Sequence, residues 1–234
     1  MTRGFRILGR SVAAALALLP AYAAFAYMVV PAAWSRHQKK SGSADVPGLT
    51  YTAERLPADP LNVAFVGTRE DLRDAMRAAG WYEADPITFR SGLRDAASVL
   101  FAQPYVSAPM STHFLADRPQ DVAFEQTVGG SPRRRHHVRF WRTGVSGPGE
   151  PALWIGAASY DQGIGFSHYT GEVMHHIAPR IDAEREKLFS DLARARRLEC
   201  VERLAGYRPR GRGVNGGGDA YETDGAMLIG RLKN

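Results

Sequence analysis

The segment Arg133-Arg-Arg-His-His-Val-Arg-Phe-Trp141 predicts a β-strand with two different faces. Side chains alternate across a strand, so one face carries cationic and aromatic groups while the other carries apolar groups and a second histidine. The first face consists of Arg135, His137, Arg139 and Trp141. The second face consists of His136, Val138 and Phe140. Two guanidinium groups and an imidazole on one face of a short strand predict a polar site that binds an anion.

The sequence around this strand predicts an antiparallel sheet. Strands are expected at Ser111–Leu115, Val122–Val128 and Ala152–Tyr160, with short turns between them. The turn before Val122 contains Arg118 and Asp121, to which we assign a supporting, structural role. Short connections between neighbouring strands favour antiparallel pairing.

Two of the predicted helical segments have clear end signals. Thr68 and Asp71 have the spacing of a capping box, and Gly80 has the position of a C-terminal helix stop. Asp182–Leu198 carries acidic residues in its first turn and basic residues in its last, which complement the helix dipole, and Asp182 is a natural N-cap. The predicted fold class is α+β, with a largely antiparallel mixed sheet, helices packed on one face, and one transmembrane helix before the domain.

Composition limits the function classes. The chain has 234 residues, of which 44% are hydrophobic, and a net charge of +6, which indicates a globular domain with an anionic partner. The single cysteine, Cys200, excludes an intramolecular disulfide, and its place in an expected strand predicts burial in the core. The basic, glycine-rich run 208–213 has only Tyr207 nearby for base stacking, so nucleic-acid binding is not expected.

The N-terminal segment predicts a membrane anchor. No charged residue occurs from Ser11 to Ser35. Val12–Ala33 is long enough, at about 1.5 Å per residue, to cross a hydrocarbon core of about 30 Å. A cleaved signal peptide is the alternative, because Ala24-Phe25-Ala26 has the form of a cleavage site. The sequence leaves that choice open, and both alternatives send the remaining chain into or across a membrane.

The chain is expected to divide into three parts. Residues 1–36 form the anchor, and residues 37–59 form a polar linker rich in Gly, Pro and Ser. Residues 60–234 form the globular domain.

Several motifs in the globular part resemble the LssY C-terminal domain family. The matching segments are Pro60–Gly67, Ala78–Trp81, Arg118–Asp121, Arg135–Trp141, Trp154–Ala157 with Asp161, and His175-His176 leading to Asp182–Arg185. The resemblance implies a membrane-linked domain of the bacterial cell envelope, in a family without an established reaction. The expected location is therefore the bacterial inner membrane, with the C-terminal domain outside the cytoplasm.

Four of the seven histidines form two adjacent pairs, His136-His137 and His175-His176. Neighbours on a strand point to opposite faces, so one member of each pair can serve a common site. The candidate catalytic residues are His137, His175 and Asp161. The candidate anion-binding residues are Arg135, Arg139 and Arg185, and Asp182, Arg118 and Asp121 are expected to support the site.

Two kinds of chemistry remain open for this site. His137, His175 and a carboxylate, Asp161 or Asp182, would suit a divalent metal such as zinc, manganese or iron, although no H-E-x-x-H spacing occurs. Alternatively, the arginines bind a phosphate or carboxylate while a histidine acts as acid, base or nucleophile. No G-x-S-x-G elbow or P-loop is present.

The predicted function is that of a membrane-anchored envelope domain whose His/Arg/Asp pocket binds an anionic group such as a phosphate. Its reaction, and whether it is an enzyme, stay open. The alternative is a non-enzymatic accessory module that docks on anionic lipid headgroups or on a membrane or secretion partner.

Overall fold

The structure is a computed structural model that describes residues 18, 20–22, 25, 29–30, 48–53, 55–85, 110–129, 131–143, 150–169, 171 and 173–233. Most of the expected anchor, Val12–Ala33, lies outside these residues. Across the part of the chain that the structure describes, no helix has both the length and the apolar character needed to span a bilayer.

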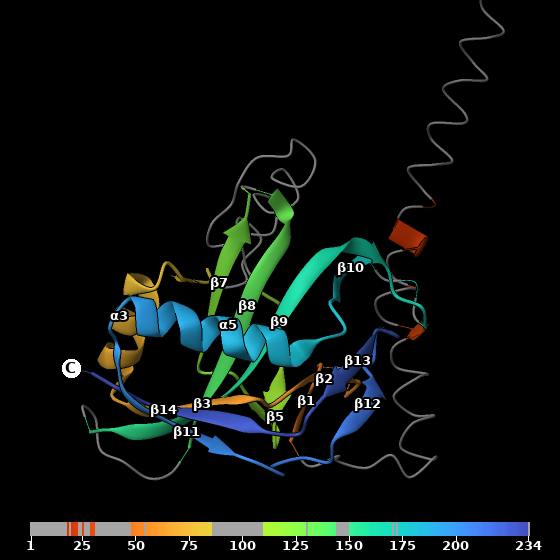
Figure 1. Cartoon of the computed structure of the whole chain (residues 1–234). Coiled ribbons are helices and arrows are strands. Elements are labelled where there is room, and N and C mark those ends of the chain that lie inside the picture. The colour runs from red at the N-terminus through yellow and green to blue at the C-terminus, as the bar shows by residue number, and fades with distance from the viewer. Residues whose placement is uncertain are drawn as a thin grey trace, which may run out of the picture.

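An eight-stranded sheet forms the centre of the domain (Figure 1). Its strands are β3 (Val63–Gly67), β4 (Tyr82–Glu83), β7 (Val122–Val128), β8 (Ser131–Thr143), β9 (Ala152–Phe166), β10 (Val173–Ile177), β11 (Leu198–Leu204) and β14 (Met227–Leu232). They follow the order β11-β14-β3-β9-β8-β7-β4, and β10 pairs with β9. Only the pair β14–β3 is parallel among these described strands, so the prediction of a largely antiparallel mixed sheet is confirmed.

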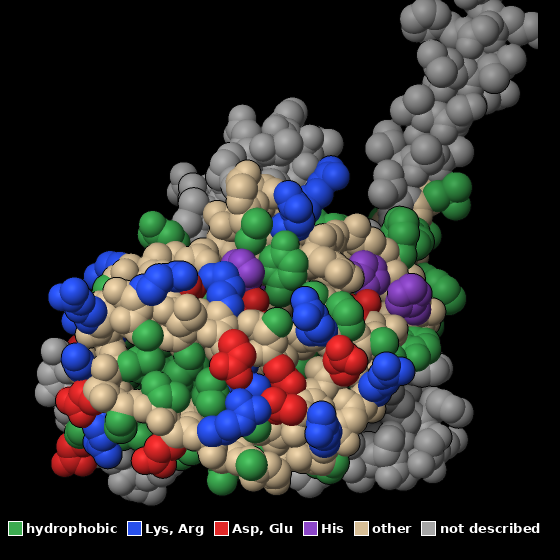
Figure 2. Space-filling view, in the orientation of Figure 1, with side chains coloured by type: hydrophobic (Ala, Val, Ile, Leu, Met, Phe, Trp, Pro, Cys, Tyr) green, Lys and Arg blue, Asp and Glu red, His purple; other side chains and the backbone are tan. Residues whose placement is uncertain are grey.

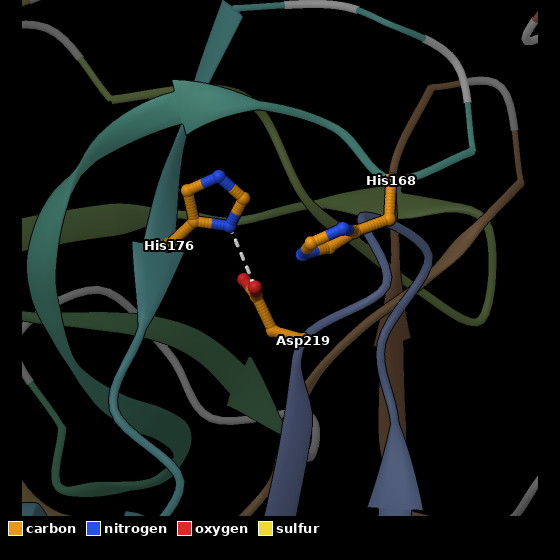
Figure 3. A group of neighbouring side chains, drawn as sticks. All are labelled: His168, His176 and Asp219. Atoms are coloured by element: carbon orange, nitrogen blue, oxygen red, sulfur yellow. Dashed lines mark hydrogen bonds and ion pairs between the residues drawn. The ribbon is translucent and has the colours of Figure 1, made fainter.

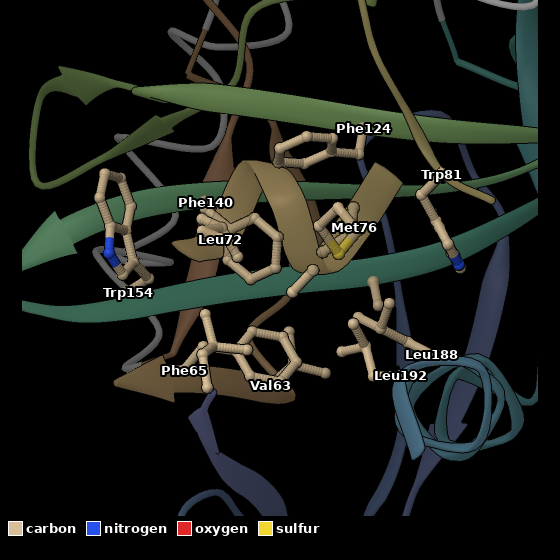
Figure 4. Close-up of a cluster of buried hydrophobic side chains, with 14 of the residues drawn as sticks. Val63, Phe65, Leu72, Met76, Trp81, Phe124, Phe140, Trp154, Leu188 and Leu192 are labelled. Atoms are coloured by element: carbon tan, nitrogen blue, oxygen red, sulfur yellow. The ribbon is translucent and has the colours of Figure 1, made fainter. Parts of the chain in front are cut away.

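Helices α3 (Arg69–Ala78) and α5 (Ile181–Arg194) cover one face of this sheet (Figure 1). Their buried apolar side chains pack in one core with side chains from β3, β7, β8 and β9 (Figure 4). Residues of this core include Phe65, Leu72, Met76, Trp81, Phe124, Phe140, Trp154, Leu188 and Leu192. Helix packing on one face, as predicted from the sequence, leaves the other face available for a second layer.

The start of α3 follows the predicted capping box. Thr68 Oγ1 accepts a hydrogen bond from the Asp71 amide at 3.0 Å, and the Thr68 amide donates to Asp71 Oδ2 at 2.8 Å. Gly80, just past the C-cap, has a φ of 81°. Glycine adopts this left-handed conformation without a steric penalty, so it ends the helix where predicted.

The opposite face of the sheet carries short strands. A four-stranded sheet contains β1 (Leu49–Tyr51), β2 (Pro57–Pro60), β5 (Phe114–Leu115) and β6 (Arg118–Pro119), and β12 (Gly211–Val214) forms a hairpin with β13 (Ala220–Thr223). A second apolar cluster lies on this face and contains Leu61, Ala64, Trp141, Ala157 and Met227. The alternation predicted for the 133–141 strand is therefore confirmed, because Trp141 joins this cluster while Phe140 faces the helices.

Several element boundaries differ from the prediction. The expected linker, residues 37–59, contains β1 and most of β2. The sequence did not predict these strands, because segments of three or four residues between prolines lack a recognisable apolar alternation. Strand β9 continues past Tyr160 to Phe166, where its last residues gain a partner in β10. Helix α5 ends at Arg194, and Arg196 then adopts a φ of 57°.

Cys200 is exposed, so the prediction that it lies in the core is wrong. It belongs to β11, which is the edge strand of the large sheet and whose residues are nearly all exposed. The sequence pattern of a strand does not distinguish an edge strand from a central one.

Candidate functional site

A cavity of about 250 Å³ lies on the face of the sheet opposite the helices. It brings together five of the site residues that the sequence predicts, from three adjacent strands: Arg135, His137 and Arg139 of β8, Asp161 of β9 and His175 of β10. His137 and His175 therefore lie on the same side of the sheet. Further lining residues include Asp59, Ser111, His113, Met174 and Asn215.

Strand register explains why these residues meet. In the antiparallel pair β8–β9, Arg135 lies opposite Asp161, and the alternating pattern directs His137 and Arg139 to the same face. The extension of β9 beyond Tyr160 lets β10 pair with it, which places His175 opposite Ile164. Without this extension, no described strand would bring the second histidine pair beside the first.

Asp161 links Arg135 and His137 within the cavity. Its Oδ1 atom lies 2.9 Å from His137 Nε2, and its Oδ2 atom accepts a hydrogen bond from Arg135 Nε at 3.0 Å. Arg135 Nη1 also donates to Glu125 Oε2 at 2.8 Å. Burial by itself raises the pKa of Asp161, but the interaction with His137 and the charge of Arg135 together lower that pKa far below its usual value. Asp161 is therefore ionised and orients its two partners.

Arg139 holds the other nitrogen of His137. Its Nη1 atom lies 3.1 Å from His137 Nδ1 and donates to Asp59 Oδ2 at 2.9 Å. A guanidinium only donates hydrogen bonds, so His137 Nδ1 accepts from Arg139 and His137 Nε2 donates to Asp161 Oδ1. Both ring nitrogens of His137 are therefore engaged by groups of the cavity wall. Among the described residues, His137 and His175 do not form a close three-ligand group with Asp161 or Asp182, so the predicted metal set lacks geometric support.

Two residues of the cavity escaped the sequence analysis. Asp59 falls in the expected linker, and His113 falls in the expected strand Ser111–Leu115 but was not assigned to the site, yet both are buried beside Arg139. His113 Nδ1 lies 3.6 Å from Asp59 Oδ2 and 3.4 Å from Thr50 Oγ1. Burial, followed by the charge of Arg139, lowers the pKa of His113 well below its usual value, so its ring is neutral at pH 7. The one signal in the sequence that pointed to a residue such as Asp59 is the need of Arg139, if buried, for a carboxylate partner.

Arg185 does not line this cavity. Its guanidinium is fully buried, and it donates to Asp224 Oδ2 at 2.9 Å, to Glu186 Oε1 at 2.8 Å and to the Ala226 carbonyl at 2.8 Å. Burial opposes the charge of Arg185, but these carboxylates outweigh it and raise its pKa. Its donors serve a network between α5 and the chain after β13, and its side chain lines a different cavity, of about 630 Å³, with Arg180, Arg210 and Arg212. Arg185 therefore does not share a site with Arg135 and Arg139.

The remaining expected residues also hold structural positions. Asp182 is not the N-cap of α5, because the helix begins at Ile181 and Asp182 instead accepts from the Asp224 amide at 2.6 Å. Arg118 Nη2 donates to Asp121 Oδ2 at 2.7 Å, and the same carboxylate oxygen accepts from the Arg142 amide at 2.7 Å. The Arg118–Asp121 pair thus ties the turn before β7 to the end of β8.

Comparison with known proteins gives one match. A family model described as the LssY C-terminus matches residues 43–227, which is most of the chain and includes every residue of the cavity. The match begins before β1, in agreement with the structured segment found in the expected linker. No curated protein and no solved structure matches the chain.

Proposed function

The chain belongs to the LssY C-terminal domain family, and on that premise we propose that it is a membrane-anchored envelope domain whose cavity binds a small anionic group such as a phosphate ester. The observation that carries the proposal is the convergence of Arg135, Arg139 and His137 with His175 on one cavity.

The cavity walls combine guanidinium and imidazole groups with carboxylates, and Glu125 also binds Arg135. Two arginines and three histidines line the cavity, including His113, against two aspartates, Asp59 and Asp161. Both aspartates bind protein donors, so they orient the guanidinium and imidazole groups and their charges are compensated within the wall. A phosphate or carboxylate accepts several charge-assisted hydrogen bonds in such surroundings. The volume of about 250 Å³ falls below the range of roughly 300–1,000 Å³ typical of larger ligands, which favours a compact group.

The helix-bearing face gives no matching support for docking on anionic lipid. Figure 2 shows that Lys and Arg side chains on this face are interspersed with Asp and Glu. Such a mixed surface has no large basic patch among the residues drawn in colour, so it produces little net attraction to an anionic membrane. The cavity therefore supports the binding proposal better than this face supports the accessory-module alternative.

A direct test compares two arginines of β8 in the full-length chain, purified in a non-ionic detergent. Arg139→Gln removes a charge from the cavity, and Arg134→Gln removes the same charge from an exposed position of the same strand. Calorimetric titration with inorganic phosphate, glycerol 3-phosphate and a short-chain phosphatidic acid should show binding to wild type and Arg134→Gln and none to Arg139→Gln. Ser111→Ala provides a second, less buried cavity variant, because Ser111 Oγ accepts from Arg139 at 3.2 Å.

Equal binding by wild type and the two cavity variants would refute the proposal, as would an absence of binding to every ligand. Release of inorganic phosphate from the two esters by wild type alone would identify an enzyme. Equal association of all variants with anionic vesicles, without binding of the soluble ligands, would favour the accessory module.

The membrane anchor is a separate part of the proposal. It is supported by the uncharged run Ser11–Ser35 and by the apolar length of Val12–Ala33. A periplasm-active reporter fused after Asn234 should be active, and a reporter active only in the cytoplasm should be silent. The reverse result would overturn the assignment of the domain to the outside of the cytoplasm.

A further inference from the structure

A cluster of two histidines and one aspartate lies where the end of β9, the strand β10 and the β12–β13 turn meet (Figure 3). His168 follows β9, His176 belongs to β10, and Asp219 precedes β13. One nitrogen or oxygen atom from each side chain lies within 4.8 Å of the others. We propose that His168, His176 and Asp219 bind a divalent transition-metal ion of the zinc class.

The donor set determines the class of metal. Two imidazoles and a carboxylate are ligands of zinc and its first-row neighbours, whereas magnesium and calcium prefer oxygen ligands alone. His176 Nδ1 lies 2.6 Å from Asp219 Oδ1, and Figure 3 shows the His168 ring turned toward the same carboxylate. His168 is exposed, so a metal held by three protein ligands keeps a coordination position open to water.

The backbone aims the carboxylate at the two imidazoles. Asp219 Oδ2 accepts a hydrogen bond from the Ile177 amide at 3.1 Å and lies 3.4 Å from Asn215 Nδ2. Asn215 Oδ1 in turn accepts from the amides of Gly217 at 3.0 Å and Asp219 at 2.8 Å, which holds the turn in place. With Oδ2 occupied in this way, Oδ1 remains directed at His176. Hydrogen bonds to the ligands of a metal site position them and typically change affinity by about 10–100-fold.

Two glycines make room for the two imidazoles. A Cβ atom at Gly165 would lie 2.7 Å from His176 Nε2, and a Cβ atom at Gly218 would lie 2.5 Å from His168 Cβ. Gly218 also has a φ of 93°, a conformation that side chains disfavour. Any larger residue at Gly165 or Gly218 would therefore displace the histidine that it faces.

The cluster is distinct from the anion-binding cavity. His168, His176 and Asp219 are not among the lining residues, and His175 and His176 alternate along β10. The two sites share a support, because Asn215, which positions Asp219, also lines the cavity. The metal proposal does not rest on the proposed function, and either can fail without the other.

A similar pair elsewhere in the domain supplies a matched control. His136 Nδ1 lies 2.8 Å from Glu184 Oε2, which repeats the His–carboxylate contact without a second imidazole within the described region. If a contact of this kind were enough to bind zinc, this pair would bind it as well. The proposal requires that it does not.

The test uses the full-length chain with an affinity tag that contains no histidine, purified without chelators. Elemental analysis and zinc titration should give one tightly bound zinc ion per chain, and cobalt substitution should give the visible absorption of a tetrahedral N/O site. His168→Ala and Asp219→Asn should each weaken zinc binding by at least about 100-fold, the upper end for positioning contacts. His136→Gln should bind zinc as wild type does, and magnesium or calcium should not compete.

A positioning variant separates ligand geometry from folding. Gly165→Ala keeps all three ligands but forces His176 to move, so zinc affinity should fall while the far-UV circular dichroism spectrum stays unchanged. His168→Ala, at an exposed position, should also keep the wild-type spectrum. The proposal is overturned if wild type binds no zinc, or if zinc binds equally to wild type, His168→Ala and Asp219→Asn.

Discussion

Asp161 Oδ1 lies 2.9 Å from His137 Nε2, and both residues are almost completely buried at the wall of the cavity. Asp161 lies directly opposite Arg135 in the β8–β9 pair, so its carboxylate reaches His137 diagonally across the strands while it also binds Arg135. One carboxylate thus fixes two groups of the proposed anion site. Glu125 also binds Arg135, and Asp59 binds Arg139.

The first prediction concerns the stability supplied by Asp161. Asp161→Asn removes the charge that compensates Arg135 and replaces one of the two carboxylate acceptors with an NH2 donor, so a buried cation loses a charged partner. The free energy of unfolding should fall by about 3–5 kcal/mol, the cost typical of breaking a buried ion pair from one side. Urea denaturation followed by tryptophan fluorescence measures this loss.

Asp117→Asn is the matched control for that substitution. Asp117 pairs with Arg55, but both side chains are largely exposed, and asparagine tolerates the φ of 63° at this position. Its unfolding midpoint should stay close to that of wild type. An equal loss in the two variants would contradict the assigned role of Asp161.

The second prediction concerns pH. The pKa of His113 is lowered in the folded state, so the unfolded chain takes up a proton near the ordinary histidine pKa of about 6.5 while the folded chain does not. The unfolded state then binds more protons, and stability falls as pH decreases below about 6.5. Urea denaturation between pH 8 and pH 5 should show this loss, with ~1.4 kcal/mol as the limiting slope per pH unit for one proton.

His113→Asn should flatten that upper part of the pH profile. A second loss should remain at lower pH, because the pKa of Asp161 is depressed in the folded state. Its contribution is fully present above the unfolded pKa of about 3.9 and is lost as pH falls below that value. A wild-type profile that is flat from pH 8 to pH 5 would show that the His113 ring is protonated in the folded protein.

The third prediction concerns the start of α3. Thr68→Ala removes the side-chain oxygen that accepts from the Asp71 amide, so stability should fall by about 1 kcal/mol. The same denaturation assay measures the change. Ser190→Ala removes a hydroxyl from an exposed interior position of α5, where alanine is the better helix former, and should cause no loss. If Ser190→Ala were the more destabilising change, the cap would not explain the effect.

The fourth prediction concerns the only cysteine. Cys200 is exposed on the edge strand β11, so a maleimide should modify it in the native protein as rapidly as in urea-unfolded protein. Mass spectrometry counts one added label, and Cys200→Ser should add none. Modification that requires denaturant would place β11 inside the domain and contradict its edge position.

The local pattern of the sequence predicted the local structure well. The alternation in 133–141 correctly separates Trp141 from Phe140, and the bounds of β7 agree with the expected Val122–Val128. The cap at Thr68 is also where the sequence places it. These features depend on residues within a few positions of one another, so periodicity and turn residues carry the necessary information. The same motifs also indicated the family to which the chain belongs.

The composition of the sites depended on contacts between distant segments. Asp59 and His113 come from short segments that are distant from Arg139 in the sequence. Arg185 donates to Asp224, which lies in a later part of the chain. His168 meets His176 and Asp219 only because the extended β9 turns back into β10 beside the β12–β13 turn.

The sequence by itself therefore determined the strand faces, the helix cap and the family, because near neighbours set those features. Only the tertiary structure decided which charged groups pair, which strand lies at the edge and which histidines share a site. Those outcomes depend on the register and order of strands that are far apart along the chain, and neither is encoded in the period of any one segment.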